Sequence, residues 1–157
     1  MMRKHKQEIT DPNVLEKILF EGTICRLAMM DVDKPYLLPF NYGYQDGCLY
    51  IHSAPEGKKI DLLKENNRVC FEIESPTELT IHEKPCKWAF KYQSIVGYGH
   101  VEILTDLEKK KSGLDIIMSH YEFEGKPGYE DKQVDFIVIL KVVIDEMTGK
   151  QSSNWEV

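Results

Sequence analysis

The residues best suited to chemistry lie between positions 49 and 63, where an apolar segment ends at His52 and Ser53. A helix is expected to begin near Gly57, and Lys58 and Lys59 fall in its first turn. Cations are unfavourable there, because a helix N-terminus already carries a partial positive charge. Free backbone N–H groups, the helix dipole and two ammonium groups would together bind a phosphate dianion. The alternative is that both lysines extend into solvent.

The segment 35–44 predicts a strand with two unequal faces, because successive side chains point to opposite sides of a strand. The bulky face comprises Tyr36, Leu38, Phe40, Tyr42 and Tyr44, and the flat face comprises Leu37, Pro39, Asn41 and Gly43. A flat face lets a planar ligand approach the backbone and form hydrogen bonds with it. Close packing against another strand explains the same pattern. Since proline has no N–H to donate, a bulge or a sheet edge is expected at Pro39.

Other catalytic arrangements are missing from the sequence. No serine lies in a nucleophile-elbow context, no pair of carboxylates is placed for acid–base catalysis, and the five histidines are scattered. None of the four cysteines, Cys25, Cys48, Cys70 and Cys86, forms a CxxC pair, so we expect no metal site. We expect their thiols to be free, and to be buried where the cysteine lies in an apolar run of sequence. Any enzymatic chemistry is therefore expected to come from a bound cofactor.

The elements that must position these residues begin with a helix capped by Asp11, with Pro12 in its first turn and Gly22 at its end. The apolar period then changes to two, which predicts strands. The predicted strands are residues 23–30, 35–44, 48–53, 68–74, 78–82, 92–104 and 135–144. Residues 31–34 and 45–47 are predicted hairpin turns, and 57–66 a short helix.

The second half of the chain adds one amphipathic helix. Thr105 and Glu108 match a capping box, and the apolar stripe that follows extends to about residue 122. Gly97 and Gly99 interrupt the long strand before it and predict a bulge or a close backbone approach. Residues 124–132 are a predicted polar loop.

The last strand and the tail carry two further expectations. Ile139 and Leu140 should be buried on opposite faces of that strand. The tail from Asp145 is polar apart from Met147 and Trp155. Such a large ring in a polar tail suggests docking on a neighbouring subunit or near the ligand, the alternative being a disordered terminus.

Short turns and brief helices argue against a doubly wound parallel sheet, which needs a crossover helix after most strands. They favour a mainly β fold with short helices, arranged as a largely antiparallel barrel, because closure removes exposed edges. With 157 residues, one domain spanning 1–157 is expected, with 1–10 and 146–157 as peripheral tails. Pairing of two barrels is a common way to complete a small core, so a homodimer is expected.

Composition excludes several classes of protein. Hydrophobic residues make up 42% and charged residues 29%, which is typical of a globular chain and not of a disordered one. A net charge of −6 without a basic stripe argues against nucleic acid or an anionic membrane as partner. No apolar run approaches the roughly 20 residues of a membrane span, and no apolar segment follows the basic start. A cytoplasmic location is therefore expected.

Several short motifs, taken in order, resemble those of the pyridoxamine-phosphate-oxidase-like FMN-binding split barrels, especially the nitroimidazole-reductase or nitroimidazole-resistance-like branch. They are Arg26-Leu27-Ala28-Met29, Pro35-Tyr36, Pro39-Phe40-Asn41-Tyr42, Tyr50-Ile51-His52-Ser53-Ala54, Gly57-Lys58-Lys59, Arg68-Val69-Cys70-Phe71, Tyr92-Gln93-Ser94-Ile95-Val96 and Gly99. The resemblance extends from about Arg3 to Gly149, and so covers nearly the whole chain.

The resemblance implies a dimeric split barrel with two FMN molecules in clefts between the subunits. It places the flavin along Pro39, Phe40, Asn41 and Tyr42, and its phosphate at His52, Ser53, Lys58 and Lys59. It places Tyr92, Gln93, Ser94 and Val96 beside the isoalloxazine, with the partner subunit as one source of them. Many relatives carry arginine in the basic pair; here both residues are lysine, which keeps the charge but loses bidentate binding of phosphate.

The resemblance further implies an FMN-dependent oxidoreductase that reduces a small nitroaromatic, quinone or similar acceptor, with a reduced nicotinamide or another donor supplying electrons. No residue is assigned as catalytic, and His52 is the one side chain expected to modulate the flavin. The alternatives are a non-catalytic flavin-binding protein, or the same fold holding deazaflavin or haem. No arginine follows Lys91, which argues against vitamin biosynthesis.

Overall fold

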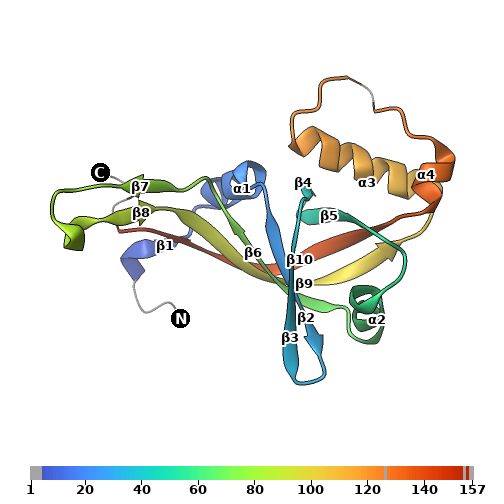
Figure 1. Cartoon of the computed structure of the whole chain (residues 1–157), viewed down its shortest axis with the longest axis horizontal. Helices are drawn as coiled ribbons and strands as arrows, with labels where there is room; N and C mark the ends of the chain where they lie inside the picture. The colour runs from blue at the N-terminus through green and yellow to red at the C-terminus, as the bar shows by residue number, and fades with distance from the viewer. Residues whose placement is uncertain (1–4, 126, 154, 156–157) are drawn as a thin grey trace.

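The computed structural model describes residues 5–125, 127–153 and 155 of the chain (Figure 1). Its main sheet is antiparallel, with the strand order β3-β2-β6-β9-β10-β5-β4, and β1 pairs with the far end of β10. These strands are β1 (Glu8–Ile9), β2 (Cys25–Asp31), β3 (Lys34–Phe40), β4 (Gly43–Gln45), β5 (Cys48–Ser53), β6 (Arg68–Glu74), β9 (Gln93–Leu104) and β10 (Val138–Gln151). The edge strands β3 and β4 follow one another in the chain, yet no ladder joins them in the described part. This is the predicted split barrel.

One hydrophobic cluster fills the inside of the curved sheet. Leu27, Phe71 and Leu140 are fully buried in it. A Cβ at Gly97 would collide with the Phe71 ring, and a Cβ at Gly99 would collide with the carbonyl oxygen of Val143. The predicted close approach at these two glycines is thus confirmed, and the bulge lies on the facing strand, between Ile144 and Glu146.

Three helices close and cover the barrel. In α1 (Pro12–Glu21), the carboxylate of Asp11 accepts the N–H of Asn13 at 2.9 Å, as predicted for the cap. In α2 (Lys58–Glu65), the buried side chains Ile60, Leu62 and Leu63 join the core cluster. The third, α3 (Leu107–His120), packs on β4, β5 and β10. Figure 1 shows α2 and α3 on different sides of the sheet.

The prediction for Ile139 and Leu140 is confirmed, because both side chains are fully buried on opposite faces. Leu140 belongs to the barrel cluster, whereas Ile139 lies under α3. A Cβ at Gly113 of α3 would approach within 2.9 Å of Ile139, so the helix sits very close to the strand.

Two local predictions are wrong. The segment 35–44 is two strands rather than one, because Tyr42 turns inward and its hydroxyl donates to the Leu19 carbonyl at 2.7 Å. The cap of α3 is Asp106, whose carboxylate accepts the N–H of Lys109, and not the Thr105 capping box.

The end of the chain also differs from expectation. A short helix α4 (Asp131–Asp135) begins at the end of the predicted loop 124–132 and reaches the predicted start of the last strand, which begins only at Val138. That strand continues to Gln151 along β9, so 146–151 belongs to the sheet and not to a peripheral tail. Residues 8 and 9 of the other predicted tail pair with Lys150 and Gly149. In this segment alternate residues face inward, among them Met147 and Gly149. The alternation was not visible in the sequence, because most residues of the segment are polar.

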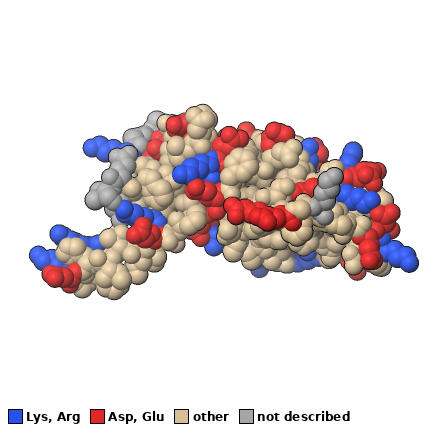
Figure 2. Space-filling model, turned by 90° about the horizontal axis from the view of Figure 1, so that it is seen from above, with Lys and Arg blue, Asp and Glu red and all other residues tan. Residues whose placement is uncertain are grey.

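A separate two-stranded ribbon joins β6 to β9. It consists of β7 (Glu78–Thr80) and β8 (Ala89–Lys91), with a 3-10 turn at Pro85–Lys87 between them. The predicted strand 78–82 ends at Thr80, and β8 was not predicted. Residues 78–91, called the arm below, stand off the body of the molecule (Figures 1 and 2). Among the described residues, no helix has the length and apolar character to cross a bilayer.

Candidate functional site

The strand-to-helix segment places an open helix N-terminus directly after β5. The N-cap residue Gly57 has φ 106°, which favours glycine, and no side chain caps the helix. Nothing lies within 4 Å of the position that a Cβ at Gly57 would take, so the N-terminus can be approached freely. His52 is exposed, whereas Ser53 is buried and its hydroxyl donates to the Ala54 carbonyl at 2.9 Å. Backbone N–H groups are thus available for an anion.

The two lysines of this segment have different surroundings. The Lys58 ammonium lies 2.6 Å from Asp31 Oδ2 and 4.8 Å from the centroid of the Tyr36 ring. The hydrogen bond to Asp31 is the main cause that raises the pKa of Lys58. Lys59 is half-buried, and no ion pair of its ammonium is found among the described residues. Lys59 is therefore the cation of this pair for which the described residues supply no counter-charge.

A broad part of the sheet has no helix over its outward side in the described part of the chain. We call this surface the open face, and define it by the outward side chains Arg26, Ala28, Met30, Leu37, Pro39, Cys70, Glu72, Val96 and Tyr98. Leu37 is 58% exposed, Tyr98 50%, Met30 45% and Val96 40%. So many exposed apolar side chains on one surface indicate a binding surface rather than ordinary scatter.

A hollow of about 480 Å³ lies on the open face. Its lining is mostly apolar and comprises Ala28, Met29, Met30, Pro35, Arg68, Val69, Cys70, Tyr98 and Glu146. The volume falls in the usual range for small-molecule sites. Met30 and Pro35 are the chain neighbours of Asp31 and Tyr36, the two residues that Lys58 contacts. Because successive residues of a strand point to opposite faces, Met30 and Pro35 project away from the side on which Lys58 contacts Tyr36, so the hollow and the N-terminus of α2 lie on opposite sides of the β2–β3 hairpin.

The open face also carries a charged network, which lies outside the lining of this hollow. The guanidinium of Arg26 donates to Glu72 at 2.9 Å and to Glu74 at 3.2 Å. These hydrogen bonds, first of all the one to Glu72, raise the pKa of Arg26. All three side chains are partly exposed, so the network fixes orientation more than it adds stability.

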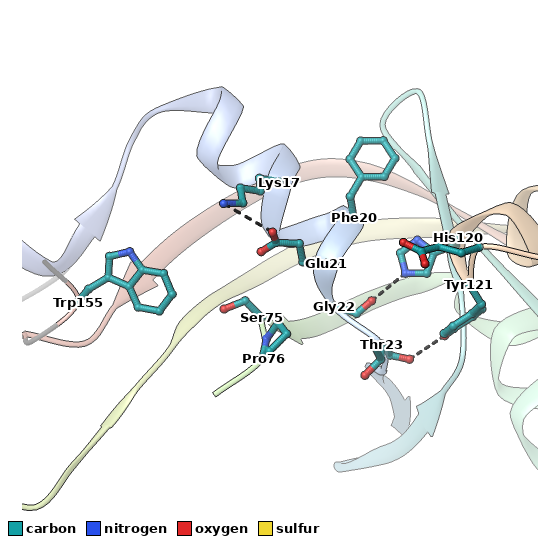
Figure 3. Close-up of a pocket in the computed structure, with 11 residues that line it drawn as sticks. Lys17, Phe20, Glu21, Gly22, Thr23, Ser75, Pro76, His120, Tyr121 and Trp155 are labelled. Carbon is teal, nitrogen blue, oxygen red and sulfur yellow. Dashed lines mark hydrogen bonds and ion pairs between the residues drawn. The ribbon is translucent and has the colours of Figure 1, made fainter. Parts of the chain in front are cut away.

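A second cavity, of about 590 Å³, lies at the other end of the barrel (Figure 3). His120 and Tyr121, at the end of α3, reach the start of β2: His120 Nε2 lies 2.7 Å from the Gly22 carbonyl oxygen, and the Tyr121 hydroxyl donates to the Thr23 carbonyl at 2.7 Å. The Tyr121 hydroxyl also accepts the N–H of Tyr42. These contacts tie α3 to the barrel, so the polar groups here act mainly in structure. Trp155 is half-buried at the rim of this cavity.

The predicted site residues fall into two groups. His52, Ser53, Lys58 and Lys59 lie at the α2 end, whereas Asn41, Tyr42, Tyr92, Gln93 and Ser94 lie towards the second cavity. Asp31, which contacts Lys58, marks one end of β2, and Cys25, six residues away, marks the other. Cys25 is in register with Phe40 on β3 and, through β6, with Ile95 on β9, so it marks the position of the second group. Six residues of strand span about 20 Å. Within one chain, the two groups thus lie towards opposite ends of the barrel.

The predicted residues also differ in exposure. Tyr42 is fully buried in the core, and Gln93 is 5% exposed with its amide bound to Gln151. Phe40 packs against the core cluster. Pro39 and Val96 project outward and lie in the same row across the sheet, in which Pro39 pairs with Arg26, Arg26 with Glu72, and Glu72 with Val96. In the described chain, therefore, only part of the predicted set offers a side chain to a ligand.

Sequence reasoning did not single out Met30, Cys70 or Tyr98, which line the hollow. Their signal was the period of two within β2, β6 and β9, where even-numbered residues share the outward face. Because these residues are apolar, the pattern alone did not separate an exposed face from a buried one. Among the described residues, no group of three or more His, Cys, Asp or Glu side chains is placed to hold a metal ion.

Comparisons with known proteins agree with this architecture. A family model described as pyridoxamine 5'-phosphate oxidase matches residues 11–151. The crystal structure of a proposed 5-nitroimidazole antibiotic resistance protein from Bacteroides thetaiotaomicron is 36% identical, with a TM-score of 0.81, over 92% of this chain and 86% of that one. A FAD-binding protein from Mesorhizobium loti is 25% identical, with a TM-score of 0.65, over 91% of this chain and 96% of that one.

A curated relative covers less of the chain. It is an uncharacterized protein of Rhizobium meliloti, 36% identical over 56 residues, and the match spans 36% of this chain and 36% of that protein.

Proposed function

The chain belongs to the pyridoxamine 5'-phosphate oxidase family, and on that premise we propose that it is an FMN-dependent oxidoreductase that reduces a small nitroaromatic, quinone or similar acceptor. The observation that carries this proposal is an uncapped, lysine-bearing helix N-terminus at the same β2–β3 hairpin whose other side bears an apolar hollow. FMN combines a flat, largely apolar ring system with a phosphate dianion. The two parts of the molecule match the two parts of the site.

The fit of the phosphate rests on Lys59 and the backbone of α2. The first N–H groups of α2 have no side-chain cap, and the space beside Gly57 is open. Lys59 adds a charge that no described carboxylate neutralises. Lys58 can add a second charge only by loosening its contact with Asp31. Phosphate binding therefore relies first on Lys59.

The fit of the ring system rests on the hollow. Its lining combines the small side chains of Ala28 and Cys70 with the larger ones of Tyr98 and Met30. These residues would orient a ring and exclude water from one of its faces. FMN, when bound, supplies the hydride and electron transfer that no side chain here provides. His52 is exposed beside the phosphate segment and remains the side chain that we expect to modulate the flavin.

We propose that two copies of the chain form the complete site. The open face is apolar and exposed, and the second group of predicted residues lies about 20 Å of strand away from Lys58. A twofold interface on the open face would carry Ser94 and Val96 of one subunit towards the hollow of its partner. Both observations favour a homodimer over a monomeric site.

The acceptor class is supported by the similarity to the Bacteroides thetaiotaomicron protein, a proposed 5-nitroimidazole antibiotic resistance protein. The flavin is supported by the FAD-binding relative from Mesorhizobium loti. A reduced nicotinamide is the donor that we expect.

The absorption spectrum of the purified protein tests the cofactor. The proposal predicts the two visible bands of a flavin; a Soret band would replace FMN by haem, and a deazaflavin spectrum would replace it by that cofactor. Stopped-flow mixing of the reduced protein with nitroaromatics and quinones then tests the reaction. Rapid reoxidation at saturating acceptor is expected, and reoxidation no faster than that of free flavin would indicate a flavin-binding protein without this activity.

A further inference from the structure

The arm carries an apolar side that no other part of the described chain covers. Leu79 pairs with Phe90 across the ribbon, and strand alternation puts Ile81 and Trp88 on the same side. Ile81 is 68% exposed, Phe90 57%, Trp88 51% and Leu79 43%. Figures 1 and 2 show the arm standing away from the body. A two-stranded ribbon is marginally stable alone in water, so this side requires a partner surface.

The tip of the arm is already ordered for binding. The indole N–H of Trp88 donates to the His82 carbonyl at 2.7 Å, and the N–H of Lys84 donates to His82 Nδ1 at 3.0 Å. The 3-10 turn Pro85–Lys87 lies within this loop. Because the ring of Trp88 is held in place while half-exposed, little conformational freedom would be lost when it binds.

The arm joins the open face through the chain. β8 is separated by Tyr92 alone from β9, the strand that carries the exposed open-face residues Val96 and Tyr98. Charge is complementary as well. Lys84 and Lys87 lie at the tip, and Glu146 borders the hollow without an ion pair among the described residues. One surface thus offers cations beside apolar anchors, and the other offers a carboxylate beside an apolar hollow.

We propose that the arm of each protomer lies across the open face of a second copy of this chain, with Trp88 and Phe90 as its anchors. Each copy carries both an arm and an open face, so one twofold interface covers both surfaces at once. The inference shares the homodimer with the proposed function but requires no flavin. It adds the arm as the element that holds the partner at its open face.

The test uses the full-length protein without flavin. Sedimentation equilibrium should show that W88A/F90A raises the dimer dissociation constant by about a hundredfold or more, as expected for two aromatic anchors. The control is F136A, which removes a side chain that is 77% exposed and lies outside the arm. F136A should leave the constant unchanged. An unchanged constant in W88A/F90A, or a wild-type protein that is monomeric, would overturn the inference.

A second measurement leaves the arm intact, and so stays decisive if W88A/F90A does not fold. The sequence has two tryptophans, so Trp88 is the only one in the variant W155F. Its emission should shift to the red as the dimer is diluted into monomers, because the ring becomes exposed. Emission that is the same in dimer and monomer would contradict docking of the arm.

Flavin binding is measured separately, so the two proposals can fail independently. A dimer that depends on Trp88 and Phe90 but binds no FMN supports the arm and removes the proposed cofactor. An FMN-binding dimer that is indifferent to W88A/F90A removes the arm and leaves the cofactor.

Discussion

Lys58 and Lys59 are adjacent in the sequence but have different electrostatic surroundings. Lys58 bridges α2 and the β2–β3 hairpin through Asp31 and the Tyr36 ring, whereas Lys59 has no described counter-charge. An anion at the N-terminus of α2 therefore competes with Asp31 for Lys58 but meets Lys59 directly. In the proposed phosphate site, the Asp31 carboxylate would hold one of the two cations.

Replacing Asp31 by asparagine should strengthen FMN binding several-fold. The substitution removes the carboxylate that engages Lys58 at 2.6 Å, and leaves the ammonium for phosphate. Flavin fluorescence titration measures the change. Asp33→Asn, in the same hairpin turn, is the matched control and should alter affinity little. Weaker FMN binding in Asp31→Asn would show that Asp31 positions Lys58 rather than competing for it.

Burial of the Cys25 thiol gives stability a dependence on alkaline pH. Burial is the main cause that raises the pKa of Cys25 from 9.0 to about 12. Between these values the unfolded chain has lost a proton that the folded chain retains, so this contribution is complete below pH 9 and is lost as pH rises towards 12. The loss amounts to at most about 1.4 kcal/mol per pH unit.

The Cys25→Ala variant tests this dependence, because alanine has no proton to lose. Urea unfolding between pH 9 and the onset of alkaline denaturation should show a shallower loss of stability in the variant than in the wild type. The slope, and not the absolute stability, is the quantity to compare, since alanine also leaves a small cavity. Equal slopes would mean that the thiol ionises in the folded chain as it does in the unfolded one.

At the scale of elements, the contact between α3 and β10 is very close. A Cβ at Gly113 would lie 2.9 Å from Ile139 Cγ2 and 3.0 Å from Cγ1. Glycine within a helix otherwise costs about 0.5–1 kcal/mol relative to alanine. The position therefore trades helix propensity for close packing of the helix on the strand.

The effect of Gly113→Ala should change sign with the residue at 139. In the wild type it should destabilise by about 1–3 kcal/mol through overpacking. Ile139→Ala alone should destabilise by about 2–5 kcal/mol, and it removes the two atoms that clash. Gly113→Ala added to Ile139→Ala should then stabilise. Urea denaturation of the four proteins measures the cycle, and additive effects would contradict the packing described here.

The elements that the sequence predicted well are those with a strong apolar period or a clear cap. β5 and β6 match their predicted bounds, and α1 has its predicted cap. The end of β10 could not be predicted, because its pairing with β9 stabilises a segment in which, among the described residues after Asp145, Met147 alone adds an apolar side chain to the core. For the site, the lysine pair was visible in the sequence. The hollow was not, since only the fold shows that the outward faces of β2, β6 and β9 are left uncovered.

At the scale of the whole molecule, the barrel leaves one face uncovered and divides the predicted site residues between its two ends. A second copy on the open face accounts for both features. If it does, FMN binding and dimerisation are linked, because a ligand that binds only the dimer stabilises it.

Sedimentation of flavin-free and FMN-loaded protein tests this link. FMN should lower the dimer dissociation constant by a factor that increases with its concentration above the dissociation constant for FMN. A monomer that binds one FMN per chain with undiminished affinity would contradict the interface site, while leaving the split barrel unaffected.

The most direct test of the central claim compares FMN with riboflavin, which lacks the phosphate, in the wild type and in K58A/K59A. Charge-assisted hydrogen bonds contribute about 1.5–3 kcal/mol each, so each lysine is expected to account for about ten- to a hundredfold in FMN affinity. Lys64→Ala, in the last turn of α2, is the control and should change neither affinity. The account predicts that K58A/K59A weakens FMN binding strongly and riboflavin binding hardly at all; equal losses for the two flavins would contradict it.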